Sequence, residues 1–94
     1  MRKHFIVSLC RNGILGGGMA ADKNAVTYRT GKLTVPAEYR VLEMKYSDIR
    51  AVSCGRLFIF PTATLSMSNG EEYKFIVFGR KRFIRLLNEM GVST

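Results

Sequence analysis

The sequence predicts a mainly β domain capped by one C-terminal α-helix. Its seven antiparallel strands are expected to form either bent sheets or a partly open barrel. Three observations support this. Apolar and polar residues alternate along much of the chain. Asn-Gly, a dipeptide that readily adopts the positive φ of a tight hairpin turn, occurs at 12–13 and 69–70. The period then changes to that of a helix over 80–90. Ninety-four residues, 47% of them hydrophobic, suit one domain spanning 1–94.

Four strands are expected in the first half of the chain. They run over 4–10, 14–20, 26–29 and 39–46. The last alternates most clearly, with Leu42, Met44 and Tyr46 on its inner face. The glycines at 16–18 have no side chains to pack, so they predict a bend or the close approach of another part of the chain.

Three more strands are expected over 49–54, 57–67 and 71–78. Gly55 and Arg56 are predicted to turn the chain between the first two, and Asn69-Gly70 between the last two. The segment from Leu57 to Phe60 is continuously apolar, so either both of its faces are covered or one is an exposed contact surface. Pro61 cannot donate to a ladder, which places it at an edge or a bulge.

The final segment has the pattern of an amphipathic helix. Its apolar stripe contains Phe83, Ile84, Leu86, Leu87 and Met90. Gly91 is suited to end the helix. Such a stripe needs an apolar surface to cover, and the open mouth of a curled sheet would supply one.

The chain is strongly basic, with 15 Lys and Arg against seven Asp and Glu and a net charge of +8. This balance favours nucleic acid, anionic lipid or an acidic protein as a partner. Arg80, Lys81 and Arg82 occupy the first turn of the helix, where the helix dipole disfavours cations. With Arg85 they are candidates for binding an anion or a lipid headgroup. The alternative is that these long side chains cover apolar surface and extend into solvent.

Residues that could support catalysis do not converge in the sequence. His4 is the only histidine and lies near the terminus, and it forms no zinc-ligand spacing with Cys10 or Cys54. We therefore expect no enzyme activity, metal, cofactor or small-molecule substrate. Both cysteines are expected to be small buried hydrophobic residues of a protein in a reducing compartment.

The apolar run after the amino terminus is too short for a secretory signal, and no stretch approaches the roughly 18 apolar residues of a membrane helix. We therefore expect a cytoplasmic protein, with the inner face of the membrane as the other location to consider.

Seven strands in hairpin order followed by one amphipathic helix resemble the pleckstrin-homology-like (PH-like) superfold, and most closely its GRAM-type and bacterial PH-like branches. The likeness is carried by Gly13-Ile14-Leu15 through Asp22 into Val26-Thr27-Tyr28, by Met44-Lys45-Tyr46-Ser47-Asp48-Ile49, by Asn69-Gly70-Glu71-Glu72-Tyr73-Lys74-Phe75 and by Arg82-Phe83. The glycines at 16–18 depart from the more hydrophobic strand usual at that place. The resemblance implies a binding platform for phosphoinositides, other anionic lipids, peptides or neighbouring domains, without an active site. The first turns offer only Arg11 and Lys23 as cations, so no phosphoinositide pocket is carried over.

Three functional hypotheses follow. The preferred one is an adaptor that binds a protein partner or itself through an interaction surface formed by Leu57, Phe58, Ile59 and Phe60. The second is peripheral binding of anionic lipid through the cations of the helix. The third is nucleic-acid binding, in which Tyr28, Tyr39 or Tyr73 would stack on bases, although these tyrosines fit inward positions better.

Overall fold

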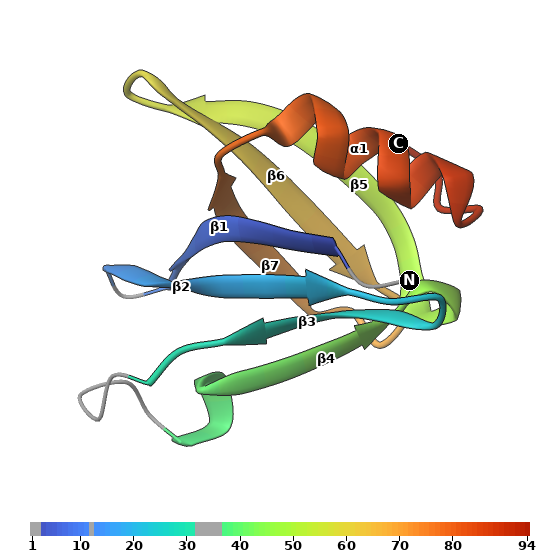
Figure 1. Ribbon diagram of the computed structural model, residues 1–94, viewed down its shortest axis with the longest axis horizontal. Coiled ribbons are helices and arrows are strands. Elements are labelled where there is room, and N and C mark those ends of the chain that lie inside the picture. Colours follow the sequence, from blue (N-terminus) through green and yellow to red (C-terminus); the bar gives the residue numbers. More distant parts are fainter. Residues whose placement is uncertain (1–2, 12, 32–36) are drawn as a thin grey trace.

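The computed structural model describes residues 3–11, 13–31 and 37–94 and shows seven antiparallel strands followed by a helix (Figure 1). The strands are β1 (Lys3–Cys10), β2 (Ile14–Ala21), β3 (Ala25–Arg29), β4 (Val41–Lys45), β5 (Ile49–Leu57), β6 (Phe60–Met67) and β7 (Glu72–Val77), and the helix is α1 (Arg80–Glu89). Short 3-10 helices lie at Ala37–Tyr39 and Tyr46–Asp48. The predicted fold class, mainly β with one C-terminal helix, is confirmed.

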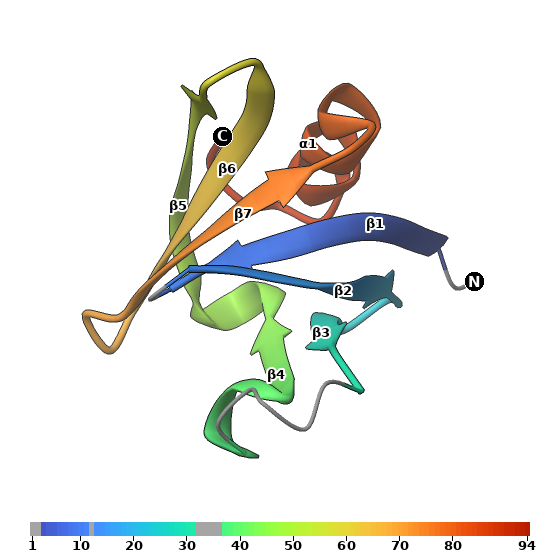
Figure 2. The same ribbon diagram turned by 90° about the vertical axis from the view of Figure 1, so that its left-hand side faces the viewer.

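The strands form a curled half-barrel in the order β4-β3-β2-β1-β7-β6-β5. β1 lies at the centre, where it pairs with β2 along eight residues but with β7 along only three. The halves on either side of β1 therefore diverge, as Figure 2 shows. Alternate side chains of each strand point into the concave side and form the core. Its largest buried members on the strands are Leu9, Met19, Tyr28, Met44, Leu65 and Phe75.

Helix α1 covers the concave side of the sheet through Phe83, Leu86 and Leu87, which are all buried. The ring of Phe83 packs edge-on against Phe5 of β1, with 5.2 Å between ring centroids. The helix therefore covers the open side of the curled sheet, as the sequence predicts.

The helix ends in a Schellman motif. Gly91 has a positive φ of 85°, and the amide of Val92 donates to the carbonyl of Leu87 at 3.0 Å. This reversal buries Val92 and leaves Met90 exposed. The expectation that Met90 belongs to the buried stripe was therefore wrong, because the chain turns back at Gly91 and Val92 fills that place in the core.

The Asn69-Gly70 hairpin between β6 and β7 is confirmed. Gly70 has a φ of 93°, and the amide of Met67 donates to the carbonyl of Glu71 at 2.8 Å. The other expected Asn-Gly turn falls partly on Asn12, which lies outside the described residues. Beside it, Gly13 has a φ of 124° and Cys10 pairs with Ile14.

The turn expected at Gly55 and Arg56 was wrong, because both residues lie inside β5. Gly55 pairs with Thr62, and the strand continues until Leu57 pairs with Phe60 across a two-residue turn. The guanidinium of Arg80 donates to the carbonyls of Gly55 (2.7 Å) and Thr62 (3.3 Å), which ties the helix to this part of the hairpin. A glycine here accommodates close packing, since a Cβ would lie 3.3 Å from Thr62 Oγ1.

Pro61 lies where no neighbouring strand needs a backbone N–H from it. It pairs with Arg56 of β5, whereas the pairing of β6 with β7 begins only at Thr62. Pro61 is thus at a local edge of the sheet, as predicted.

The glycine run of β2 marks a close approach, one of the two outcomes predicted. The ring of Tyr28 crosses Gly17, where a Cβ would lie 2.9 Å from Tyr28 Cε1 and would collide with the carbonyl oxygen of Arg29. The hydroxyl of Tyr28 then donates to the carbonyl of Leu15 at 2.6 Å. Burial raises the pKa of Tyr28, and the side-chain hydrogen bond with Thr30 opposes this shift in part. A side chain at Gly17 would displace this buried tyrosine.

We predict that Gly17→Ala lowers the free energy of unfolding by about 1 to 3 kcal/mol, because the added methyl group overpacks the contact with β3. Gly18→Ala is the matched control. The nearest atom to a Cβ at Gly18 is the carbonyl oxygen of Phe5 at 4.0 Å, so alanine should be tolerated or slightly stabilising there. Urea unfolding of both variants measures the difference, and equal midpoints would contradict the close approach.

Candidate functional site

The tip of the β5–β6 hairpin exposes two large apolar side chains. Phe58 is 87% and Ile59 86% exposed. Figure 1 shows this hairpin projecting past the start of α1. Phe58 also has a φ of 57°, the one positive φ outside glycine among the described residues. A bulky residue in this conformation costs about 1 to 3 kcal/mol and occurs mainly at functional positions.

An apolar row continues from this tip over β5 and β6 and past the end of β7 to β1. The amide of Phe78 donates to the carbonyl of Ile6 at 3.1 Å, the rings of Phe78 and Phe60 lie 6.2 Å apart, and Phe60 pairs with Leu57. Ile6 is 70% and Phe78 48% exposed. The tip and this row together form what we call the apolar strip. It comprises Ile6, Leu57, Phe58, Ile59, Phe60 and Phe78.

The sequence indicated four of these six residues. Of its two alternatives for 57–60, coverage of both faces is wrong, because Phe58 and Ile59 are exposed and Leu57 and Phe60 are only half-buried. Sequence reasoning missed Ile6 and Phe78. Ile6 carried a usable signal, since it is apolar on the outward face of β1 between the inward Phe5 and Val7. Phe78 ends a run that is apolar on both faces, a pattern typical of a covered strand. Ile76 in that run is buried, but the chain leaves the sheet after Val77 and exposes Phe78.

The four candidate cations of the helix do not form one cluster. Arg82 donates to the carbonyl of His4 at 3.0 Å, and its guanidinium lies 4.7 Å from the ring centroid of Phe5, on the β1 side of the helix. Arg80, Lys81 and Arg85 instead line a groove on the β5 side. The bonds made by Arg80 and Arg82 to strand carbonyls explain how cations are tolerated at the start of this helix.

This second feature, which we call the cationic groove, has a volume of about 470 Å³. It is lined by Cys54, Arg80, Lys81, Ile84, Arg85 and Asn88. Cys54 is exposed in it and Cys10 is half-buried, so the expectation of two buried cysteines was wrong. The reason is that Cys54 lies in this open groove at the side of α1 and not among the core residues. Both thiols are free.

Acidic residues are missing from two segments that include the β5–β6 hairpin and most of α1. Positions 49–70 and 73–88 contain no Asp or Glu, but they contain seven Lys or Arg. These cations are Arg50, Arg56, Lys74, Arg80, Lys81, Arg82 and Arg85. The net charge of +8 is therefore unevenly distributed, and the hairpin tip and the start of α1 belong to its positive part.

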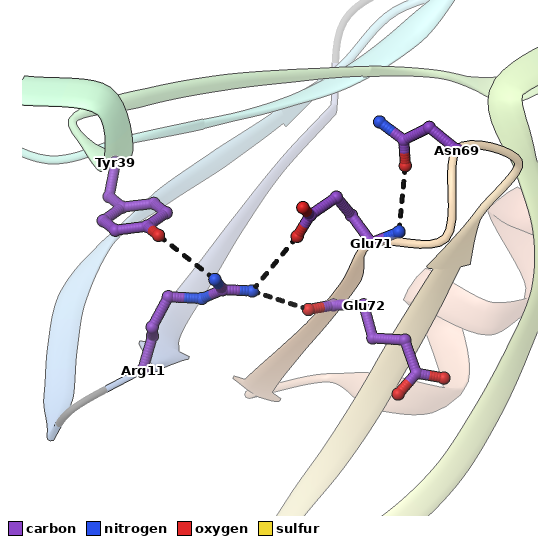
Figure 3. A network of polar contacts seen from close by, with 5 residues as sticks. All are labelled: Arg11, Tyr39, Asn69, Glu71 and Glu72. Carbon is purple, nitrogen blue, oxygen red and sulfur yellow. Dashed lines mark hydrogen bonds and ion pairs between the residues drawn. The ribbon is translucent and has the colours of Figure 1, made fainter.

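The tyrosines considered for base stacking are engaged elsewhere. Figure 3 shows Arg11 donating to Tyr39 Oη (3.1 Å) and to the carbonyl of Glu72 (2.9 Å), with Glu71 at 3.9 Å. The guanidinium of Arg11 also lies 5.0 Å and 5.3 Å from the ring centroids of Tyr39 and Tyr73.

This arrangement holds two hairpins and the 3-10 turn before β4 together. Burial, followed by the charge of Glu71, raises the pKa of Tyr73, and Arg11 opposes this shift. Tyr28 is fully buried. These contacts give Arg11 a structural role and leave no aromatic platform for nucleic-acid bases at these positions.

The residues that the structure describes form neither a metal-ligand cluster nor a membrane-spanning helix. In the parts of the chain that the structure describes, no three His, Cys, Asp or Glu side chains gather as metal ligands. No helix within 3–11, 13–31 and 37–94 has the length and apolar character needed to cross a membrane.

Comparison with protein-family models finds no matching family, and comparison with curated proteins finds no match. The apolar strip and the cationic groove are therefore the features from which a function is inferred.

We predict that Phe58→Gly raises the free energy of unfolding by about 1 kcal/mol, because glycine adopts a positive φ without strain. Ile59→Gly is the matched control. Ile59 has no positive φ, so the same change there should give no gain. Thermal unfolding measures both variants. A Phe58→Gly protein no more stable than Ile59→Gly would show that the turn is not strained.

Proposed function

We propose that this protein is a non-catalytic binding module that attaches to anionic membranes by inserting the tip of its β5–β6 hairpin. The observation that carries the proposal is the near-complete exposure of Phe58 and Ile59 on a strained turn. A tip of two side chains is narrow and suits insertion into a fluid layer better than contact with a flat protein surface. The net charge of +8 complements an anionic leaflet.

The spacing of the cations behind the tip supports this mode of attachment. Arg56 lies two residues before Phe58, and Arg80 is bonded to the hairpin at Gly55 and Thr62, three residues from the turn. At about 3.4 Å per residue, the cations lie about 7 to 10 Å behind the tip. Side chains that enter the headgroup and acyl boundary reach a depth of about 5 to 10 Å, which would bring the cations to the lipid phosphates.

The magnitudes are sufficient for reversible binding. Burying Phe58 and Ile59 contributes about 1.5 to 3 kcal/mol each. Each cation near an anionic surface contributes about 1 kcal/mol. With Arg56, Arg80 and Lys81 near the surface, the total reaches about 6 to 9 kcal/mol, which corresponds to dissociation constants between about 0.3 and about 40 micromolar. Neither contribution alone would give stable attachment.

A protein partner or a second copy of this chain is the second candidate function. The row formed by Ile6, Phe78, Phe60 and Leu57 favours it, because these residues follow one another across the sheet rather than lying at a tip. Exposed apolar rows of this kind mark interaction surfaces. Nucleic acid remains the third, with the net charge in its favour and the buried or engaged tyrosines against it.

Membership of the PH-like superfold, in a GRAM-type or bacterial PH-like branch, is part of the same proposal. The order of the seven strands and the position of the terminal helix support it. Attachment from the cytoplasmic side of a membrane would agree with it.

We predict that Ile59→Trp reports insertion. The chain has no tryptophan, so this substitution provides one fluorophore at the tip. Its emission should shift to the blue with vesicles of phosphatidylcholine and phosphatidylserine, and much less with phosphatidylcholine alone. Brominated acyl chains should quench it. Val41→Trp, on the exposed side of β4, is the control whose emission should stay unchanged.

The competing functions give different results in the same experiment. Phe58→Gly in the Ile59→Trp protein should weaken vesicle binding by about tenfold or more, since one of the two inserted side chains is lost. Binding that depends on charge but gives no blue shift would contradict insertion. Light scattering that shows a dimer, together with no vesicle binding, would favour the second candidate.

A further inference from the structure

The strand β4 forms a free edge of the sheet. It is the first strand in the sheet order, so only β3 pairs with it, and Figure 1 shows it at the margin of the sheet away from α1. The amide of Tyr46 donates to the carbonyl of Asn24 at 3.1 Å, and the amide of Thr30 donates to the carbonyl of Arg40 at 3.0 Å. These two bonds close the ends of the β3–β4 ladder and fix which residues of β4 bond toward β3.

Three residues of β4 direct their backbone groups away from the sheet. Hydrogen-bonded and non-hydrogen-bonded pairs alternate along antiparallel strands. Since Arg40 and Tyr46 bond toward β3, the N–H and C=O of Val41, Glu43 and Lys45 point outward. No backbone bond from any other described residue reaches these three, and all three are exposed. The edge of β4 can therefore pair with another strand.

The charges on the two sides of Met44 have opposite signs. Each charge before Met44 is matched by the opposite charge at the same distance after it, in the pairs Glu43 and Lys45, Arg40 and Asp48, and Glu38 and Arg50. A second copy that runs antiparallel about Met44 therefore presents the opposite charge at every charged position from 38 to 50. The innermost of these pairs, Glu43 and Lys45, lies within β4 and has strand geometry.

Charge selects the register of such a pairing. Two antiparallel copies exchange ladder hydrogen bonds where their outward-directed residues face each other. A register centred on Glu43 would place this carboxylate opposite its own copy, which is unfavourable. A register centred on Met44 places Glu43 of each copy opposite Lys45 of the other, as two hydrogen-bonded pairs of opposite charge. Charged edge strands often repel a neighbouring strand, but the change of sign along β4 attracts an antiparallel copy.

We propose that β4 pairs with β4 of a second copy of this chain, antiparallel and centred on Met44, so that the two sheets become continuous. The occupant is a second copy because the charges of this edge are complementary to themselves. The paired segment is short, so the dimer is weak and depends on concentration. This interface is separate from the apolar strip and goes beyond the proposed membrane function, since it forms whether or not the hairpin tip inserts.

Exchange of the two charges tests the register. Sedimentation velocity of the full chain without lipid should show a dimer that grows with concentration. Glu43→Lys and Lys45→Glu should each weaken it by about tenfold or more, because like charges then face each other. A mixture of these two variants should form a heterodimer about as tight as the parent dimer, since both pairs are again of opposite charge. The double variant with Glu43→Lys and Lys45→Glu should also regain the homodimer.

Controls with the same changes of net charge locate the interface. Glu89→Lys on α1 and Lys74→Glu on β7 lie on other elements than β4, and each should stay within about twofold of the parent. Equal losses in these controls, a mixture that does not form the heterodimer, or a parent that stays monomeric at millimolar concentration would overturn the proposal. A dimer that survives Glu43→Lys but dissociates on Ile6→Ser would overturn it as well, because self-association would then occur through the apolar strip.

A proline substitution tests the ladder independently of charge. Lys45 has a φ of −68°, the value that proline requires, and its N–H points outward, so Lys45→Pro should keep the fold and lose one ladder donor in each copy. Lys45→Ala loses the same charge but keeps the donor. We expect the proline variant to dimerise more weakly than the alanine variant.

Amide exchange of the parent protein provides the second charge-independent measurement. Exchange at Glu43 and Lys45 should slow as the protein concentration rises, whereas Met44 already bonds to β3 and should change little. Equal dimerisation of the proline and alanine variants, or exchange at Glu43 and Lys45 that does not depend on concentration, would overturn the proposal.

Discussion

The packing of α1 into the concave side of the sheet is the constraint on which the rest of the structure depends. β1 and β7 share only three paired residues, so the two halves of the sheet are weakly joined along the ladder itself. Phe83 and Leu87 fill the space between these halves and bury the concave surface around Phe5. Truncating such buried side chains to alanine costs about 3 to 5 kcal/mol for phenylalanine and about 2 to 5 kcal/mol for leucine, a large fraction of the about 5 to 15 kcal/mol by which a domain is stable.

The four basic residues of α1 differ in their contacts, since two bond to the sheet and two do not. Arg80 and Arg82 reach in opposite directions to strand carbonyls, so they tie α1 to the β5–β6 hairpin on one side and to β1 on the other. Hydrogen bonds of charged donors are worth more than neutral ones, which offsets the unfavourable helix dipole. Lys81 and Arg85 make no such bond among the described residues and remain available to a ligand. Of these four basic residues, two therefore stabilise the packing of the helix and two can contact a ligand.

The fold could be predicted from the sequence because its signals are local. Alternation places Leu65 and Phe75 on the inner face, Asn69-Gly70 defines a hairpin, and the helical stripe explains Phe83. The site could be predicted only in part, because its features depend on register across strands. Ile6 joins the apolar strip through its pairing with Phe78, which no local pattern reveals. The turn at Phe58 was missed for a different reason, since its residues contradict ordinary turn chemistry.

That contradiction is the strongest internal argument for a function at the tip. The same sheet contains a turn built on Asn69-Gly70, with glycine at the positive φ of 93°. At the β5–β6 turn a phenylalanine has the positive φ, although glycine would remove both the strain and the exposed ring. Neither Phe58 nor Ile59 belongs to the core cluster, so folding does not require them. A position that lowers stability and solubility together is expected where an interaction with a partner compensates for both.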